Sequence, residues 1–204
     1  CLGEATKFSH YQLDADKSYQ ATILLGSQTD TGDADGQVTA EAPIPAFDDV
    51  MLDKVAQQFL GAQQQIPPMY SALKKDGKKL YEYARNNIPV TPPSKEVEIY
   101  SLDLLEDPKY LNNTIEFKIK CKVSKGTYIR SLIRDIAYDL NTYGTMKNLV
   151  RTKQGIFSLE DSYTLEDIQN DNYKLLTIRE VLSNIPITII EGDTLKKVQN
   201  GMSL

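Results

Sequence analysis

The segment 114–140 constrains the fold most, because its apolar residues change from a period of two to the period of a helix. Up to Val123, apolar residues alternate with polar and charged ones, which predicts a strand with one buried face. After a turn at Lys125-Gly126, apolar residues recur every three or four positions, which predicts a helix with one buried stripe. We expect Thr127 to be the N-cap of this helix. The expected buried residues are Ile115, Phe117, Ile119, Cys121 and Val123 in the strand, and Ile129, Leu132, Ile133, Ile136, Ala137 and Leu140 in the helix.

The same region is strongly basic. From Lys118 to Arg134 there are six basic residues and no acidic one, although the formal net charge of the chain is -5. Arg130 falls in the first turn of the expected helix, where the helix dipole stabilises anions and disfavours cations. An arginine at this position therefore indicates binding to an anion, either a carboxylate or a phosphate. The alternative interpretation is a solvated basic face, with the lysines on the wet side of an antiparallel sheet.

Composition excludes several kinds of site. With 204 residues, of which 41% are hydrophobic, the chain can bury a sizeable core. No apolar run approaches the roughly 20 residues that a membrane span needs. Two cysteines exclude a disulfide framework or a cysteine-based zinc site, and a single histidine excludes a histidine cluster. We expect a cytoplasmic protein that binds no metal, does not associate with membranes and acts as a monomer.

Charge is distributed unevenly along the chain. Residues 28–53 include seven acidic side chains and no basic one, and residues 160–171 include five and none. Such acidic faces repel nucleic acid. If the basic groups of the chain meet in space, they form one cleft that can bind a polyanion. These groups are the segment 118–134, the cluster Lys74, Lys75, Lys78, Lys79 and Arg85, and the run Lys147, Arg151 and Lys153.

The order of the expected elements favours an α+β fold. Because they show neither a regular βαβ repeat nor an all-β pattern, we expect a mixed, largely antiparallel sheet flanked by helices. Outside 114–140, the expected helices are 4–13, one from 48 or 49 to 60, and 79–86, and the expected strands are 18–26, 37–42, 96–105 and 146–157. A short basic hairpin is expected around Asp76-Gly77.

The loop TDTGDADG (29–36) has the alternating aspartates of a calcium site. A calcium loop needs carboxylates at three alternate positions, then glycine, then a glutamate that closes a loop of about 12 residues. Asp33, Asp35 and Gly36 do not continue in that way. A structural turn with glycine at positive φ is the simplest interpretation. The functional alternative is a carboxylate that accepts hydrogen bonds from a base or sugar.

Four segments resemble bacterial tRNA pseudouridine-55 synthases of the TruB type, in their order and spacing. They are CLGEATKF (1–8), DKSYQATILLGSQTDTGDADG (16–36), IPPMYSALKKDGKKLYEYAR (66–85) and SKGTYIRSLIRDIAYDL (124–140), and the match covers nearly all of 1–157. The resemblance implies a pseudouridine-synthase-like fold and isomerisation of one uridine to pseudouridine. It also implies the T-arm stem-loop of tRNA as partner, base flipping, and no metal or cofactor.

The resemblance implies that parts of the family's architecture lie outside these 204 residues. In the family, the nucleophilic aspartate lies in a GxLDxxATG-type loop just before the CLGEATKF segment, so we expect it to be absent from this chain. Residues 194–204 resemble the opening of the family's C-terminal PUA RNA-binding domain. We therefore expect a fold truncated at both ends, with the catalytic domain at 1–186 and the start of a PUA-like domain at 187–204. Alone, such a chain should be inactive.

The resemblance also implies roles for individual residues. Arg130 matches the arginine of the KGTYIR motif and would hold the nucleophilic carboxylate in a charge-assisted pair. Tyr19 would stack on the flipped uracil and take part in proton loss from the rearranged base, although a tyrosine on a strand is also typical of half-buried packing. The expected substrate-binding residues are Asp33 at the flipped nucleotide, Leu149 as an apolar wall, and Lys74 and Lys125 as phosphate or structural contacts.

Two other classes of function stay open. The chain could be an RNA-binding module without catalysis, as the absence of the nucleophile would imply. It could also be a phosphate-binding enzyme for small molecules, with Lys125 and Arg130 at the helix terminus as its anion site.

Overall fold

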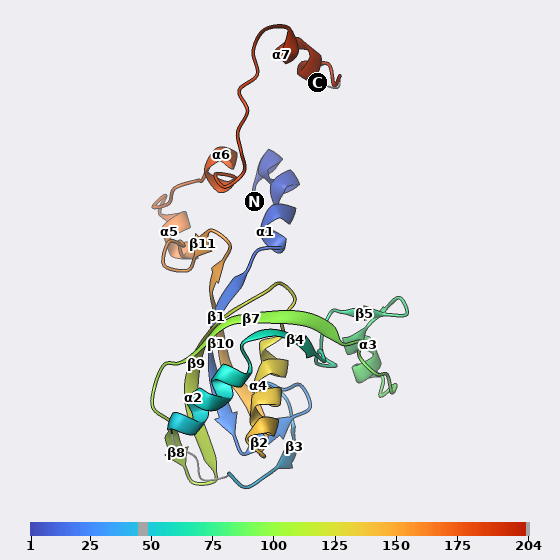
Figure 1. Ribbon diagram of the computed structural model, residues 1–204, viewed down its shortest axis with the longest axis vertical. Coiled ribbons are helices and arrows are strands. Elements are labelled where there is room, and N and C mark those ends of the chain that lie inside the picture. Colours follow the sequence, from blue (N-terminus) through green and yellow to red (C-terminus); the bar gives the residue numbers. More distant parts are fainter. Residues whose placement is uncertain (45–48, 203–204) are drawn as a thin grey trace. The chain divides into compact units, whose positions relative to one another are not determined.

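A sheet of antiparallel strands forms the unit Ser9–Ser162 of the computed structural model, which describes residues 1–44 and 49–202 (Figure 1). The strands pair in the order β11-β10-β1-β9-β7-β4, and β8 also pairs with β9. Helices accompany this sheet, so the expected α+β fold is confirmed. The strands are β1 (Lys17–Leu25), β4 (Gly61–Gln65), β7 (Lys95–Leu104), β8 (Lys109–Leu111), β9 (Thr114–Val123), β10 (Gly144–Gln154) and β11 (Phe157–Ser158).

Two hairpins and several short helices complete the unit Ser9–Ser162. The predicted basic hairpin is confirmed, and both of its turn residues, Asp76 and Gly77, have positive φ (51° and 81°). Asp48, one of the two expected starts of the second helix, lies outside the described residues. The hairpins are β2 (Ser27–Thr29) with β3 (Val38–Glu41) and β5 (Lys74–Lys75) with β6 (Lys78–Lys79), and the helices are α1 (His10–Leu13), α2 (Asp49–Gln58), α3 (Leu80–Arg85) and α4 (Ile129–Asp139).

The core lies between one face of the sheet and the helices α2 and α4. All the apolar residues predicted to be buried in 114–140 belong to this core, and none of their side chains is more than 4% exposed. The change of period in the sequence therefore predicted both the strand β9 and the helix α4, because burial of one face requires that spacing.

The predicted cap of α4 is wrong by one residue. The N-cap is Tyr128, whose backbone is extended (φ -100°, ψ 113°) and whose side chain makes no capping hydrogen bond. Thr127 instead donates its hydroxyl hydrogen to the carbonyl of Ser124 at 2.9 Å, which closes the turn between β9 and α4. The start of α4 is therefore not stabilised by a local hydroxyl.

Two strands of the sheet, β4 and β8, lie outside every predicted strand, and the single strand predicted over 146–157 is divided into β10 and β11. β4 has the sequence GAQQQ, which lacks alternating apolar residues, and it forms a strand because it pairs with β7 along Gly61–Gln65. β8 is three residues long, each of its residues is exposed, and it pairs with the start of β9. Neither strand has a local hydrophobic pattern that predicts it. Each forms because it pairs with a longer neighbouring strand.

The lysines of β9 lie on the face of the sheet opposite to α4. Lys118 pairs with Glu106 at 2.6 Å, and Lys122 pairs with Asp16 at 3.4 Å. Lys120 lies opposite Asp103 of β7. The condition for a single basic cleft is therefore not met by these lysines, because strand alternation directs them away from the face that Arg130 occupies. The structure supports the interpretation as a solvated face.

A second unit consists of Cys1–Phe8 and Tyr163–Leu204. The expected helix over 4–13 is divided into the 3-10 helix η1 (Gly3–Phe8), which belongs to this unit, and α1, which does not. Capping boxes begin α5 (Leu165–Gln169) at Thr164 and α6 (Ile178–Val181) at Thr177, and α7 covers Gly192–Gln199. The predicted domain boundary between 186 and 187 stays a prediction.

In the described ranges 1–44 and 49–202, the helices are too short or too polar to cross a bilayer.

Gly144 of β10 allows α4 to approach the sheet closely. A Cβ atom on Gly144 would lie 2.7 Å from the Cβ of Ala137 and 3.2 Å from the carbonyl oxygen of Ile133. We expect Gly144→Ala to lower the free energy of unfolding by about 1–3 kcal/mol, because overpacking strains a close-packed core. Ala137→Gly alone should cost about 1 kcal/mol through helix propensity. The double variant should lose less than the sum of the two, as measured by urea unfolding in a double-mutant cycle. Additive losses would contradict the proposed contact.

Candidate active site

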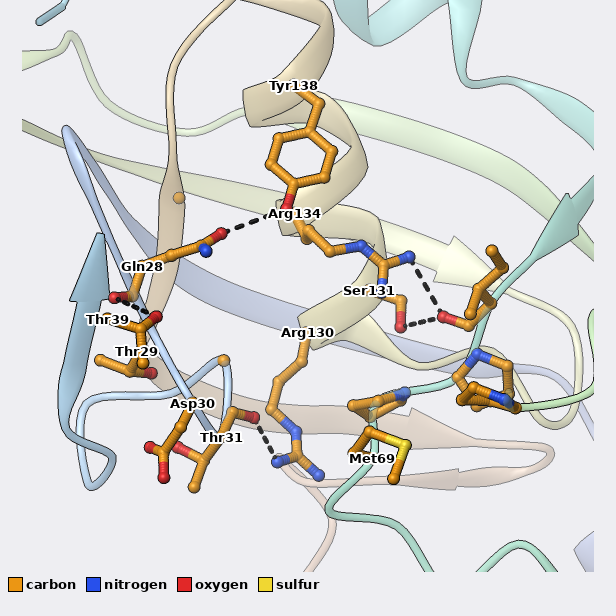
Figure 2. A pocket seen from close by; sticks show the side chains of 16 residues that line it. Gln28, Thr29, Asp30, Thr31, Thr39, Met69, Arg130, Ser131, Arg134 and Tyr138 are labelled. Carbon is orange, nitrogen blue, oxygen red and sulfur yellow. Dashed lines mark hydrogen bonds between the residues drawn. The ribbon is translucent and has the colours of Figure 1, made fainter. Parts of the chain in front are cut away.

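The guanidinium of Arg130 is held by three segments distant in sequence. Its Nη1 donates to the carbonyl of Thr31 at 2.8 Å and to Oδ2 of Asp33 at 3.1 Å, and its Nη2 donates to the carbonyl of Tyr70 at 2.8 Å. Figure 2 shows this side chain extending from the start of α4 towards the Thr31 loop. The arginine in the first helical turn therefore binds an anion, as its position predicted, and the anion within this chain is the carboxylate of Asp33.

Arg130 has hydrogen-bonding capacity left over. An arginine has five N–H groups, and the three bonds above use two from Nη1 and one from Nη2. Within residues 1–44 and 49–202, no acceptor is recorded for the Nε–H or for the second Nη2–H. A planar guanidinium can bind a carboxylate through two parallel N–H···O bonds. The side chain is 21% exposed, so a further acceptor can reach it.

The loop between β2 and β3 fixes the carboxylate of Asp33. The hydroxyl of Thr31 donates to Oδ1 of Asp33 at 2.6 Å, and the hydroxyl of Thr29 donates to the Asp33 carbonyl at 2.7 Å. Gly32 has positive φ (76°) and lies against the Arg130 side chain. The structural-turn interpretation is supported, although Gly32 rather than Gly36 has the left-handed backbone.

The same loop is bonded to the edge of β10. The N–H of Ala34 donates to the carbonyl of Met146 at 3.0 Å, and the N–H of Met146 donates to the carbonyl of Gly32 at 3.1 Å. This short parallel bridge connects the Asp33 loop directly to the sheet. Asp33 is thus fixed both by the sheet and by the helix that carries Arg130.

Tyr19 and Leu149 lie on the α4 face of the sheet. Tyr19 of β1 pairs with Cys121 of β9 and packs against the core, so its side chain is on the core face. Leu149 of β10 lies opposite Ala21, two residues from Tyr19 on the same face of β1, and is 37% exposed. Four of the predicted site residues, Arg130, Asp33, Tyr19 and Leu149, are therefore carried by neighbouring elements on one side of β1 and β10. Arg130 and Asp33 are in direct contact.

The two predicted lysines lie elsewhere. Lys74 is exposed in the β5–β6 hairpin, opposite Lys79. Lys125 forms an ion pair with Asp14 at 3.0 Å, and its hydrogen bond and charge lower the pKa of the Asp14 carboxyl. Lys125 and Arg130 bind different carboxylates, so the structure gives no support for a shared phosphate site at the start of α4. The phosphate contacts of Lys74 and Lys125 stay predictions.

A cavity of about 390 Å³ lies beside Arg130 (Figure 2). One wall is the face of α4 that carries Arg130, Arg134 and Tyr138, and the hydroxyl of Tyr138 donates to Oε1 of Gln28 at 3.1 Å. Arg134 and Tyr138 were not predicted to be neighbours of the site. Their spacing of four residues from Arg130 onward, which places them on one helical face, was the available signal.

Residues 65–70 form a second segment of the site that was not predicted. The carbonyl of Ile66 accepts hydrogen bonds from the hydroxyl of Ser131 at 2.8 Å and from Nη2 of Arg134 at 3.1 Å. Together with the bond from Arg130 to Tyr70, these contacts bind the segment along the first turns of α4. We name residues 65–70 the strap.

Cys121 cannot act as a nucleophile at neutral pH. Its side chain is fully buried, and burial raises the pKa of its thiol to about 12, despite a hydrogen bond with the backbone of Tyr19 that acts in the opposite direction. Only the thiolate is nucleophilic. In the described part of the chain, no three histidine, cysteine, aspartate or glutamate side chains are grouped so that they could bind a metal ion.

Two protein-family models together match residues 1–185 of the chain. Residues 1–129 match the TruB family pseudouridylate synthase N-terminal domain, and residues 130–185 match the tRNA pseudouridylate synthase B C-terminal domain. The tRNA pseudouridine synthase B of Psychrobacter cryohalolentis is 63% identical over 169 residues, which are 83% of this chain and 46% of that protein. The enzyme of the same name from Caldanaerobacter subterraneus is 40% identical over 203 residues, which are 98% of this chain and 69% of that protein.

Solved structures have the same fold. A chain of a Cbf5-Nop10-Gar1 complex superposes with a TM-score of 0.55 at 24% identity, over 83% of this chain and 40% of that chain. A chain of the archaeal box H/ACA sRNP Nop10-Cbf5 complex superposes with a TM-score of 0.52 at 21% identity, with coverage of 83% and 38%. The chain spans about half the length of the first two curated relatives. With two family domains matched and 63% identity to a named member, the chain belongs to the TruB family of pseudouridylate synthases.

Proposed function

We propose that this chain supplies part of the active site of a tRNA pseudouridine synthase, which isomerises a uridine of the T-arm. The relatives that match it are named tRNA pseudouridine synthase B. The reaction breaks the C1′–N1 glycosidic bond, turns the uracil and forms the C1′–C5 bond, so that C5 releases its hydrogen as a proton and N1 takes up a proton. It requires a carboxylate nucleophile that stays ionised in a site with little water.

The observation that carries this proposal is the pair of N–H groups of Arg130 without recorded acceptors in the described chain. We assign them to the nucleophilic carboxylate, which the family resemblance places in a segment before Cys1. A neighbouring guanidinium favours the ionised form of a carboxylate. Asp33 is not the nucleophile in this scheme, because both of its oxygens already accept hydrogen bonds within the protein.

The remaining site residues would bind the flipped nucleotide. Tyr19 would stack on the uracil and help to remove the C5 proton, and Leu149 would form the apolar wall beside it. Each carboxylate oxygen of Asp33 can accept a second hydrogen bond, so Asp33 could contact the nucleotide while it stays paired with Arg130. Lys74 and Lys125 would contact phosphates nearer the periphery.

The domain organisation and the state of the whole protein are also part of what we propose. We assign 1–186 to the catalytic domain and 187–204 to the start of a PUA-like RNA-binding domain. We also propose a cytoplasmic monomer that uses no metal or cofactor. The second candidate function is an RNA-binding module without catalysis, and the absence of an unpaired carboxylate beside Arg130 in the described residues is the observation that favours it.

Tritium release from 5-labelled uridine in a T-arm stem-loop tests the activity. We expect residues 1–204 alone to release none, because the proposed nucleophile is not among them. The full-length protein should release tritium without added metal. Turnover by the 204-residue chain would require a different nucleophile and would refute the scheme, and a full-length protein that binds the stem-loop without turnover would support the non-catalytic module.

Substitution of Arg130 separates a carboxylate partner from a phosphate partner. In the full-length protein, Arg130→Lys should lower the single-turnover rate about 100-fold or more, because lysine lacks the planar fork that binds a carboxylate in two bonds. Affinity for the stem-loop should change little. If Arg130 instead binds phosphate, lysine should substitute well, and Arg130→Ala should weaken affinity and reduce its salt dependence.

Basic residues on the two faces of the sheet should contribute unequally to RNA binding. Arg151 lies opposite Tyr19 and is exposed on the α4 face, so Arg151→Gln should weaken stem-loop binding and reduce the slope of log K against log salt by about 1. The matched control is the triple variant of Lys118, Lys120 and Lys122 to Gln, which removes three charges from the other face. We expect little effect from it. A larger loss in the triple variant would place the RNA on the opposite face.

A further inference from the structure

Gln65, the last residue of β4, has a buried amide that is bonded at both ends to the backbone of one residue, Tyr128. Its side chain is 2% exposed. Oε1 accepts a hydrogen bond from the N–H of Tyr128 at 2.8 Å, and Nε2 donates to the carbonyl of Tyr128 at 3.2 Å. A buried amide is costly unless its groups are bonded. The position of Gln65 is therefore coupled to that of Tyr128.

Tyr128 is the residue at which α4 begins. Its carbonyl accepts the first helical hydrogen bond, from the N–H of Leu132 at 3.0 Å, and its own side chain makes no capping bond. Gln65 bonds the same carbonyl and also the N–H of Tyr128, which the helix leaves without a partner. A shift of the helix start by one residue would break both bonds. The amide of Gln65 thus determines where the first turn lies.

The first turn is the part of α4 that carries Arg130, two residues after Tyr128. Gln65 itself pairs with Lys95 of β7, so it transmits the position of the sheet to the helix. The strap then continues to Tyr70, whose carbonyl accepts from the guanidinium of Arg130. One segment therefore fixes both the backbone and the side chain of this arginine.

We infer that Gln65 is a positioning residue for Arg130 and acts through the backbone of Tyr128 without touching the RNA. This inference rests on the function proposed above. When both bonds to Tyr128 are removed, the first turn is free to shift, and a displacement of about 1 Å at a reacting group can cost about 100-fold in rate. The effect should appear in the chemical step and not in RNA affinity, because Gln65 is buried away from the surface.

The first test compares two glutamines of the same strand in the full-length protein. Gln65→Met keeps the length of the side chain but removes both hydrogen bonds, and should lower the single-turnover rate of tritium release about 10- to 100-fold. Stem-loop affinity should stay within about 2-fold. Gln63→Met is the control, since Gln63 points to the same side of β4 but bonds only the carbonyl of Phe59, at 2.8 Å. Equal rates for the two variants would overturn the inference.

Gln65→Glu gives a second test that does not depend on how well the methionine variant folds. A neutral glutamic acid can donate to the Tyr128 carbonyl and accept from its N–H, as the amide does, whereas the carboxylate repels the carbonyl. Burial raises the pKa of such a carboxyl group. The single-turnover rate of the Gln65→Glu variant should approach that of the wild type below the raised pKa and should fall as pH rises through this pKa. The wild type should show no such fall. A constant ratio of the two rates across pH would overturn the inference, as would a fall that coincides with unfolding measured by circular dichroism.

A measurement without substrate separates this inference from the proposed function. If the wild-type full-length protein releases no tritium, the proposed function fails. The inference is then decided by the NMR signal of the Arg130 Nε–H in the 204-residue chain, assigned with Arg130→Lys. We expect this signal to shift in Gln65→Met and to stay unchanged in Gln63→Met. An unchanged signal in both variants would refute the positioning role.

Discussion

The half-buried guanidinium of Arg130 is the interaction on which the rest of the site depends. Taking a cation out of water is costly unless its N–H groups find acceptors. The acceptors here belong to two irregular segments, the loop of Thr31 and Asp33 and the strap that ends at Tyr70. The loop is joined to β10 by the short bridge between Asp33 and Met146, and Arg130 adds bonds that connect it to α4 and to the strap. Arg130 therefore holds together loops that the sheet and helices alone would leave less constrained.

The position of Arg130 also opposes the dipole of its own helix, and magnitudes show why it is tolerated. A cation in the first turn of a helix costs about 0.3–1 kcal/mol. A hydrogen bond to a charged group contributes about 1.5–3 kcal/mol, and Arg130 makes three within the chain. The acceptors therefore outweigh the dipole. The unfavourable location is explained by what the side chain binds and not by any contribution to the stability of α4.

The sequence predicted the parts of the fold that depend on local periodicity. Burial of one face determines the pattern of β9 and α4, so both elements and their buried residues could be inferred from spacing alone. The hydrogen bonds that fix the start of α4 could not be inferred in this way, because they come from Gln65, 63 residues before the N-cap Tyr128. β4 was missed for a related reason, since a polar run becomes a strand only when β7 pairs with it. Long-range hydrogen bonds leave no mark on local patterns.

The candidate site was predictable to a similar extent. The location of Arg130 in the first turn indicated an anion from helix physics, but its partner Asp33 lies 97 residues away. Only the family resemblance had assigned both residues to one site. The charge count was misleading, because it gave the lysines of β9 and Arg130 equal weight. Alternation places those lysines on the other face, beside carboxylates that offset their charge.

The register of β10 decides which side chains accompany Arg130. Met146 lies opposite Ile23 and Leu149 opposite Ala21, so three residues of β10 span two residues of β1. In an unbroken strand, residues three apart point to opposite faces, and Leu149 would then face away from the core side that Met146 occupies. The extra residue in this bulge restores Leu149 to that side, and a second irregularity lies opposite Ser18 and Tyr19. Bulges commonly redirect side chains beside active sites. The bulge therefore lets one strand serve two requirements, pairing with the Asp33 loop at Met146 and presenting Leu149 on the face of Tyr19.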